Sequence, residues 1–152
     1  MVAVLPTTSH RRLWAAVTDR LRIRRYRSMS EFAEGELVLT TGDRKNLGYR
    51  FVDQPCHSLL CREFDSNHWV RHLVAGPTQS GKSTIAFILP LLYHLFERGE
   101  DVVAGVVDLA MVADMWSERI LPMLERTRYR ELLPSSGEGA RGGAVESAVR
   151  FE

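Results

Sequence analysis

Cysteine, lysine and net charge are all scarce in this chain of 152 residues. Its two cysteines, Cys56 and Cys61, fall within one predicted helix, so a disulfide between them is disfavoured and a reducing cytoplasm fits best. Only Lys45 and Lys82 are lysines among 20 basic residues, a bias that suggests a GC-rich genome rather than a function. With a formal net charge of +1, the molecule has no overall field that would draw it to nucleic acid.

Long apolar runs are also missing. The longest, residues 85–96, is about twelve residues, against the roughly 20 that cross a bilayer, and it contains Pro90. The first residues lack the apolar core of a signal peptide. Hydrophobic residues make up 45% and charged residues 26%, which is typical of a globular domain with a core of its own. We therefore expect a cytoplasmic protein that does not bind membranes.

Residues 76–84 carry the one clear chemical pattern. They read Gly-Pro-Thr-Gln-Ser-Gly-Lys-Ser-Thr and match the phosphate-binding loop G-x-x-x-x-G-K-[ST]. In such a loop the glycines let successive amides converge on a phosphate, the lysine faces the β- and γ-phosphates, and the hydroxyl after it binds Mg²⁺. The pattern predicts binding of ATP with Mg²⁺, with Lys82 and Ser83 as catalytic residues and Ser83 as the metal ligand. The predicted binding residues of the loop are Gly76, Pro77, Thr78, Gln79, Ser80, Gly81, Lys82, Ser83 and Thr84.

The residues on either side of the loop favour the same interpretation. Residues 69–75 are rich in β-formers and end in an apolar run, which predicts a strand. Residues 85–96 are almost wholly apolar and predict a buried helix that ends near Gly99. Strand, glycine loop and helix is the order that a phosphate-binding loop requires.

The rest of the C-terminal part predicts an α/β fold. Residues 102–107 form a continuous apolar run, typical of a strand buried in a parallel sheet, and residues 145–151 resemble the start of another. Asp108 is placed to cap the next helix, which Pro122 should kink or end early. The apolar face of that helix comprises Leu109, Val112, Ala113, Trp116, Ile120 and Leu124. We expect residues 51–152 to form the N-terminal portion of a P-loop NTPase domain, a partial parallel sheet flanked by helices.

Residues 1–50 predict a segment of helices and loops ahead of that domain. Residues 10–27 have helical spacing and seven arginines, which suit either contacts to DNA phosphates or a solvated helix face. Ser28 and Glu31 resemble a capping box before a short helix. Residues 40–50 predict a loop, and residues 55–64 predict a further helix with a proline in its first turn.

The acidic element of a hydrolytic site has no clear counterpart. NTPases of this class use an apolar strand that ends in Asp, often followed by Glu, to hold Mg²⁺ and polarise water. Asp108 is the only candidate, and its place before a predicted helix favours capping instead. The chain also ends within a predicted strand. We therefore expect the N-terminal, phosphate-binding part of a longer ATPase.

Four stretches resemble, in order, the lambda-type (GpA) large terminase subunit of tailed phages and prophages. They are Ser-Met-Ser-Glu-Phe-Ala-Glu at 28–34, residues 48–63, the loop residues 79–84, and Ala113 with Ser-Glu-Arg-Ile-Leu-Pro-Met-Leu at 117–124. The loop is common to many P-loop proteins, whereas the first and last stretches together are more specific. The resemblance covers residues 28–152, and the chain has only a fraction of the family's length.

The resemblance implies a part of a DNA-packaging motor. Such a protein would couple ATP hydrolysis to translocation of double-stranded DNA in the host cytoplasm, with a small terminase subunit and a portal as partners. A downstream nuclease domain would cut the DNA. Two alternatives from other classes are a small P-loop kinase and an inactive prophage remnant that acts only as a binding module.

Three further predictions concern residues around the loop. Gln54 lies in the upstream region where many motor ATPases recognise adenine, so we expect its amide to contact the base, with Tyr49 or Phe51 stacking nearby. Met115 and Trp116 are expected in the core rather than facing a ligand. No zinc is expected. The cysteines and histidines that could bind it are spaced too closely for a usual zinc finger; they are Cys56, His57, Cys61, His68 and His72.

Overall fold

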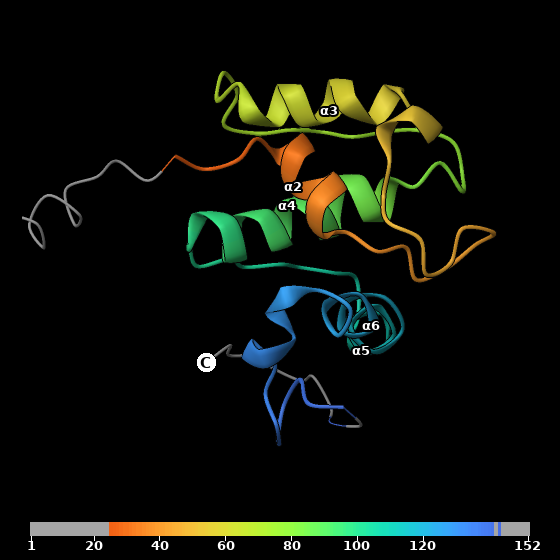
Figure 1. Ribbon diagram of the computed structural model, residues 1–152, viewed down its shortest axis with the longest axis vertical. Helices are drawn as coiled ribbons and strands as arrows, with labels where there is room; N and C mark the ends of the chain where they lie inside the picture. The colour runs from red at the N-terminus through yellow and green to blue at the C-terminus, as the bar shows by residue number, and fades with distance from the viewer. Residues whose placement is uncertain (1–24, 142, 144–152) are drawn as a thin grey trace, which may run out of the picture.

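The computed structural model describes residues 25–141 and 143, and this part is helical (Figure 1). A central helix over residues 83–98 consists of η2 (Ser83–Ile88), α4 (Leu89–Leu92) and η3 (Tyr93–Arg98). A second long helix over residues 109–124 consists of α5 (Leu109–Asp114), η4 (Met115–Ile120) and α6 (Leu121–Leu124). The shorter elements are α2 (Met29–Glu36), η1 (Phe51–Asp53), α3 (Cys56–Asp65) and η5 (Arg128–Leu132).

Helix α2 begins at the predicted capping box. The Ser28 hydroxyl accepts a hydrogen bond from the Glu31 amide at 3.2 Å, and the Glu31 carboxylate accepts one from the Ser28 amide at 2.8 Å. Two amides without a partner inside the helix are thereby satisfied, which stabilises the helix start. The buried side of α2 is formed by Met29, Phe32 and Ala33. The prediction of this helix and its cap is confirmed.

Helix α3 and the loop before it also follow the sequence. Pro55 immediately precedes α3, where its missing N–H costs no hydrogen bond. Residues 40–50 form turns and irregular chain, closed by an isolated antiparallel bridge between Val38 and Gly48. His57 and Cys61 point into the core from α3. Burial raises the pKa of the Cys61 thiol to about 11, so it stays protonated.

Both long helices contain a wide, π-helical turn ahead of a proline. In the central helix, η2 precedes Pro90, and in the second helix η4 precedes Pro122. A proline inside a helix donates no hydrogen bond, and its ring crowds the carbonyl one turn earlier, so a widened turn there relieves the clash. The second helix continues past Pro122 to Leu124, while the central helix ends at Gly99, whose φ of 67° suits a glycine.

The predicted α/β fold is wrong for the part of the chain that the structure describes. Residues 69–75 and 102–107 have no regular secondary structure and pair with no other described segment, so neither is a strand and no parallel sheet forms among residues 25–141 and 143. Val70 is fully exposed and Val103 is 99% exposed, the reverse of a buried sheet. Strand formation requires a neighbouring strand to hydrogen-bond, and β-forming residues alone do not supply one.

The core is formed by helices packed on helices. Helix α2 contacts α3, α4 and η3, and α3 also contacts η2, as Figure 1 shows with α3 and α2 beside the central helix. Phe32 meets the edge of Tyr93 at 5.6 Å between ring centroids, and Phe96 stacks on Tyr129 at 4.3 Å. The largest fully buried side chains are Phe32, Met29, Leu37, Ile85, Ile88, Leu89, Met123, Leu124 and Cys61.

The second long helix is buried only toward its C-terminal end. Trp116, Ile120 and Leu124 are buried as predicted, whereas Leu109 is 64% exposed. Trp116 is confirmed as a core residue, and its indole N–H donates to the Gly139 carbonyl at 3.0 Å. The exposed start of this helix follows the unpaired segment 102–107.

An ion-pair network joins the N-terminal side of α2 to the end of the central helix. The Arg27 guanidinium donates to Glu97 at 2.8 Å and to Glu36 at 2.9 Å, and Arg128 lies 3.0 Å from Glu36. These hydrogen bonds from Arg27 hold the pKa of Glu97 below its ordinary value. Glu97 is only 8% exposed, so the network fixes three segments around a nearly buried carboxylate.

Two predictions fall outside the described residues. They are the strand at residues 145–151 and most of the arginine-rich helix at residues 10–27. The domain boundary at residue 50 stays a prediction. Among the residues that the structure describes, no helix combines the length and the apolarity that a bilayer span needs.

Candidate functional site

The loop at residues 76–84 curls between the end of an extended segment and the start of η2. Gln79 and Gly81 have φ values of 60° and 75°, which turn the backbone twice within three residues. A Cβ on Gly81 would lie 3.0 Å from the His57 ring and 3.3 Å from the Gln54 amide oxygen. Position 81 therefore requires glycine for its conformation and for space. Gly76 has no such φ, and a Cβ there would make an ordinary contact with Lys82.

Lys82 folds back over the loop that contains it. Its ammonium donates to the Gly76 carbonyl at 2.8 Å and also to the Pro77 carbonyl. The Ser80 hydroxyl donates to the same Pro77 carbonyl at 2.9 Å. These hydrogen bonds close the loop into a ring, with the lysine's positive charge held at its edge.

Backbone donors in this ring are left without partners. The amides of residues 78–82 make no hydrogen bond to another described residue, whereas those of Thr84 and Ile85 bond to the Gly81 carbonyl at the helix start. Exposed amides that follow one another through a turn make a site that favours an anion. The start of the helix adds the positive end of its dipole.

The loop opens on a cleft of about 820 Å³. This volume is in the range of a site for a nucleotide-sized ligand. Three basic side chains, Arg44, Lys82 and Arg119, contribute to its walls. The remaining lining residues are Leu39, Thr41, Gly42, Asp43, Gln54, Gln79, Ser80, Gly81, Ser83 and Thr84.

Gln54 lies beside the loop, as the sequence suggested. Its side chain is exposed, lines the cleft and approaches Gly81 from the end of η1. The two aromatic residues nearby are engaged elsewhere: Tyr49 is buried, and Phe51 packs edge-on against it at 5.1 Å. The structure brings Gln54 to the loop, while Tyr49 and Phe51 do not line this cleft. Contact between Gln54 and adenine stays a prediction.

His57 is a site residue that sequence reasoning missed. Its ring accepts or donates at both nitrogens: Nδ1 lies 2.6 Å from the Tyr49 hydroxyl and Nε2 lies 2.9 Å from the Ser80 carbonyl. Because a carbonyl only accepts, Nε2 carries the proton and the Tyr49 hydroxyl donates to Nδ1. The imidazole thus ties α3 to the loop. No pattern in the sequence marks this hydrogen bond.

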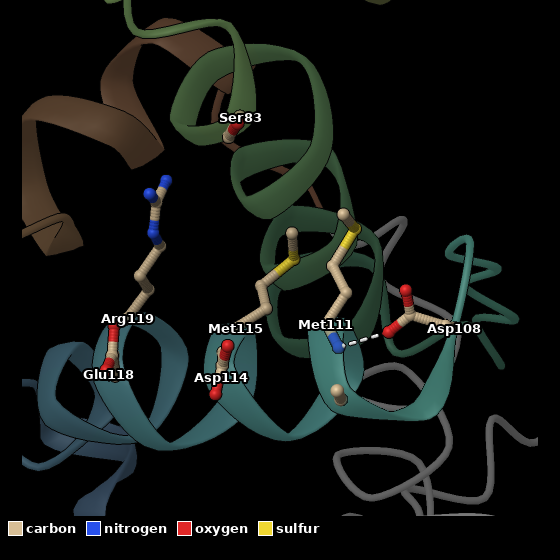
Figure 2. A pocket seen from close by; sticks show the side chains of 8 residues that line it. Ser83, Asp108, Met111, Asp114, Met115, Glu118 and Arg119 are labelled. Atoms are coloured by element: carbon tan, nitrogen blue, oxygen red, sulfur yellow. Dashed lines mark hydrogen bonds between the residues drawn. The ribbon is translucent and has the colours of Figure 1, made fainter.

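Ser83 lines both the cleft and a second cavity of about 490 Å³, and Figure 2 shows the side chains that line this second cavity. This cavity lies against the second long helix, where Met111 and Met115 face the central helix. Met115 is therefore half-buried beside the cavity rather than wholly in the core. Three acidic side chains, Asp108, Asp114 and Glu118, also line it.

Asp108 acts as the helix cap that the sequence predicted. Its carboxylate accepts a hydrogen bond from the Met111 amide at 2.7 Å, drawn as the dashed line in Figure 2. This hydrogen bond uses the carboxylate at the start of α5. In the described part of the chain, no three His, Cys, Asp or Glu side chains are grouped to hold a metal ion. The Ser83 hydroxyl is exposed at the cleft, where a ligand's Mg²⁺ would be reached.

Comparisons with protein-family models, with curated proteins and with solved structures find no match to this chain. The chemistry of the site therefore rests on its own residues.

Proposed function

We propose that this chain binds a nucleoside triphosphate, ATP, together with Mg²⁺ at residues 76–84. The observation that carries the proposal is the closed loop itself. Lys82 folds onto the first residues of the loop, and the amides of residues 78–82 have no partner among the described residues. Residues 79–84 line a nucleotide-sized cleft. A polyphosphate supplies acceptors for these amides and an opposite charge for the Lys82 ammonium, which would exchange its carbonyl partners for phosphate oxygens.

Each predicted site residue has a distinct task in this proposal. Lys82 contacts the β- and γ-phosphates, and the Ser83 hydroxyl binds Mg²⁺. The loop amides, up to Thr84, hold the β-phosphate. The Gln54 side chain, which lies beside Gly81, pairs with the edge of adenine.

We further propose that the chain is the ATP-binding part of a DNA-packaging ATPase similar to the lambda-type large terminase subunit. Support for this comes from the sequence stretches at 28–34, 48–63, 79–84 and 113–124. In that role, the energy of ATP hydrolysis would move double-stranded DNA, with a small terminase subunit and a portal as partners. The acidic residue that activates water is not assigned, because Asp108 is used as a helix cap.

Substitution of Lys82 tests nucleotide binding directly. We expect Lys82→Ala to weaken Mg–ATP binding at least about 30-fold, because a charge-assisted contact to phosphate is worth about 2 kcal/mol or more. Equilibrium titration with a fluorescent ATP analogue measures the effect. The matched control is Lys45→Ala, which removes the only other lysine, an exposed residue that lines none of the cavities described above.

Equal affinities for Lys82→Ala and wild type would contradict the proposal, as would a wild-type chain that does not bind Mg–ATP. Turnover assays separate the classes of function. Phosphate release stimulated by double-stranded DNA supports the packaging motor, whereas a phosphorylated small-molecule product supports a kinase.

A further inference from the structure

Arg119 is a basic residue of the cleft that the phosphate-loop pattern does not include. It lies on η4 in the second long helix, more than 30 residues beyond the loop, and lines both the cleft and the second cavity. Figure 2 shows its guanidinium extending from this helix toward the end of the central helix that carries Ser83. The cleft thus has a cation on a wall other than the loop itself.

The Arg119 side chain has no counter-charge among the described residues. It makes no hydrogen bond or ion pair there, although it is half-buried. Several other arginines form ion pairs: Arg44 with Asp53, Arg128 with Glu36, and Arg141 with Glu125. The described arginines that resemble Arg119 in having no ion pair are exposed to solvent, among them Arg50, Arg62, Arg71 and Arg130. A partly desolvated guanidinium without an anion is unfavourable, and an anionic ligand at this place would relieve that cost.

The acidic neighbours of Arg119 do not supply that anion. Glu118 and Asp114 line the second cavity rather than the cleft, and neither forms an ion pair with Arg119. Glu118 is exposed. Half of the residues that share the cleft with Arg119 belong to the loop, from Gln79 to Thr84. Asp43 is the one carboxylate among the described residues that line the cleft, and it is exposed and forms no ion pair with Arg119.

We propose that Arg119 contacts the terminal phosphate of a bound nucleoside triphosphate and thereby distinguishes a triphosphate from a diphosphate. The inference rests on the proposed function and deepens it. The loop amides hold the β-phosphate and Lys82 contacts the β- and γ-phosphates from one side, while Arg119 reaches the γ-phosphate from the second helix. A guanidinium suits this task because its planar N–H groups match phosphate oxygens two at a time.

The same contact would couple the second long helix to the number of phosphates on the bound nucleotide. Arg119 is attached to a helix whose first turns are exposed and which follows the unpaired segment 102–107. Through Arg119, the terminal phosphate would hold this helix against the loop. Loss of that phosphate would remove the contact between the helix and the nucleotide. The position of residues 109–124 would then depend on whether a triphosphate or a diphosphate is bound.

The test compares affinities for Mg–ATP and Mg–ADP in the full chain. We expect Arg119→Ala to weaken Mg–ATP binding about 10- to 100-fold while Mg–ADP binding stays within about twofold, since the lost contact involves only the outer phosphate. Arg119→Lys should lose less, because it keeps the charge but not the paired geometry. Arg126→Ala, an exposed arginine just past the same helix, serves as the control and should change neither affinity.

The ratio of the two affinities separates this role from a structural one. A loss of Mg–ATP and Mg–ADP binding in equal measure, or no loss of either, would overturn the role of Arg119. If Arg119→Ala does not fold, as judged by thermal melting, the ratio measured on Arg119→Lys and Arg119→Gln decides. Wild-type chain that binds neither nucleotide would instead refute the proposed function, and a failure confined to the ratio leaves that function standing.

Discussion

At the residue scale, three residues shape the loop at residues 76–84. Gly81 provides a backbone turn that no other residue fits, Gln54 lies against it, and His57 bonds the Ser80 carbonyl from α3. The loop pattern predicted that Gly81 and Lys82 belong to the site, since the chemistry of phosphate binding fixes their spacing. It did not predict His57, because a hydrogen bond to a backbone carbonyl leaves no pattern in the sequence.

The two loop glycines should respond differently to alanine. We expect Gly81→Ala to lower the free energy of unfolding by about 1–2 kcal/mol from the left-handed conformation alone, and further from its contact with His57. Gly76→Ala should cost less, because its φ is ordinary and the added methyl meets only the flexible Lys82 stem. Urea denaturation of both variants measures the difference. Equal losses would show that the described loop conformation is wrong.

Removal of the His57 imidazole should loosen the loop. His57→Phe keeps an aromatic ring but leaves the Ser80 carbonyl and the Tyr49 hydroxyl without partners, which costs about 1–3 kcal/mol of stability. We expect Mg–ATP affinity to fall as well. Tyr49→Phe is the matched variant, because it removes one hydroxyl and leaves the bond from His57 to the loop. If Tyr49→Phe weakens nucleotide binding as much as His57→Phe, the bond to Ser80 does not position the loop.

Helices follow from local sequence at the element scale, and strands do not. Ser28 with Glu31, Asp108 and Gly99 mark helix ends by hydrogen bonds or conformations within a few residues, so their roles could be predicted. Residues 69–75 and 102–107 have strand composition, but pairing depends on distant chain, and no partner lies beside them in the described part. The widened turns before Pro90 and Pro122 were not predicted either.

The ion-pair network of Glu97 with Arg27 should make the stability of the fold sensitive to acid. Its pKa lies below the ordinary 4.5, chiefly through hydrogen bonds from Arg27, so its stabilising effect is present above that value and is lost as pH falls through the lowered pKa. We expect Glu97→Gln to lower the free energy of unfolding by about 2–3 kcal/mol at pH 7. This lies between the losses that are typical of breaking an exposed ion pair and a buried ion pair.

The pH profile of unfolding checks this prediction. As pH falls from the ordinary value of 4.5 through the lowered pKa of Glu97, wild type should lose more stability than Glu97→Gln, because only wild type has this carboxylate to protonate. Chemical denaturation at several pH values gives both curves. Parallel curves would mean that Glu97 does not contribute through its charge.

At the scale of the whole molecule, the described chain is a helical core that presents a phosphate-type loop at its surface. Of the helices that form the core, α3 contacts the loop through His57, and the central helix follows it directly through η2. The sequence predicted these helices and the loop, but it placed the loop and the central helix against a parallel sheet that is absent among residues 25–141 and 143. Helix-on-helix packing depends on side chains far apart in the sequence, such as Phe32 with Tyr93, and periodicity alone does not reveal such pairs.

The most direct test of the central claim is a titration of the isotopically labelled chain with Mg–ATP, followed residue by residue through its amide NMR signals. The account predicts saturable shifts concentrated on residues 78–84, with smaller shifts at Gln54 and Arg119, and their loss in Lys82→Ala. Shifts that avoid residues 78–84, or that persist unchanged in Lys82→Ala, would contradict it.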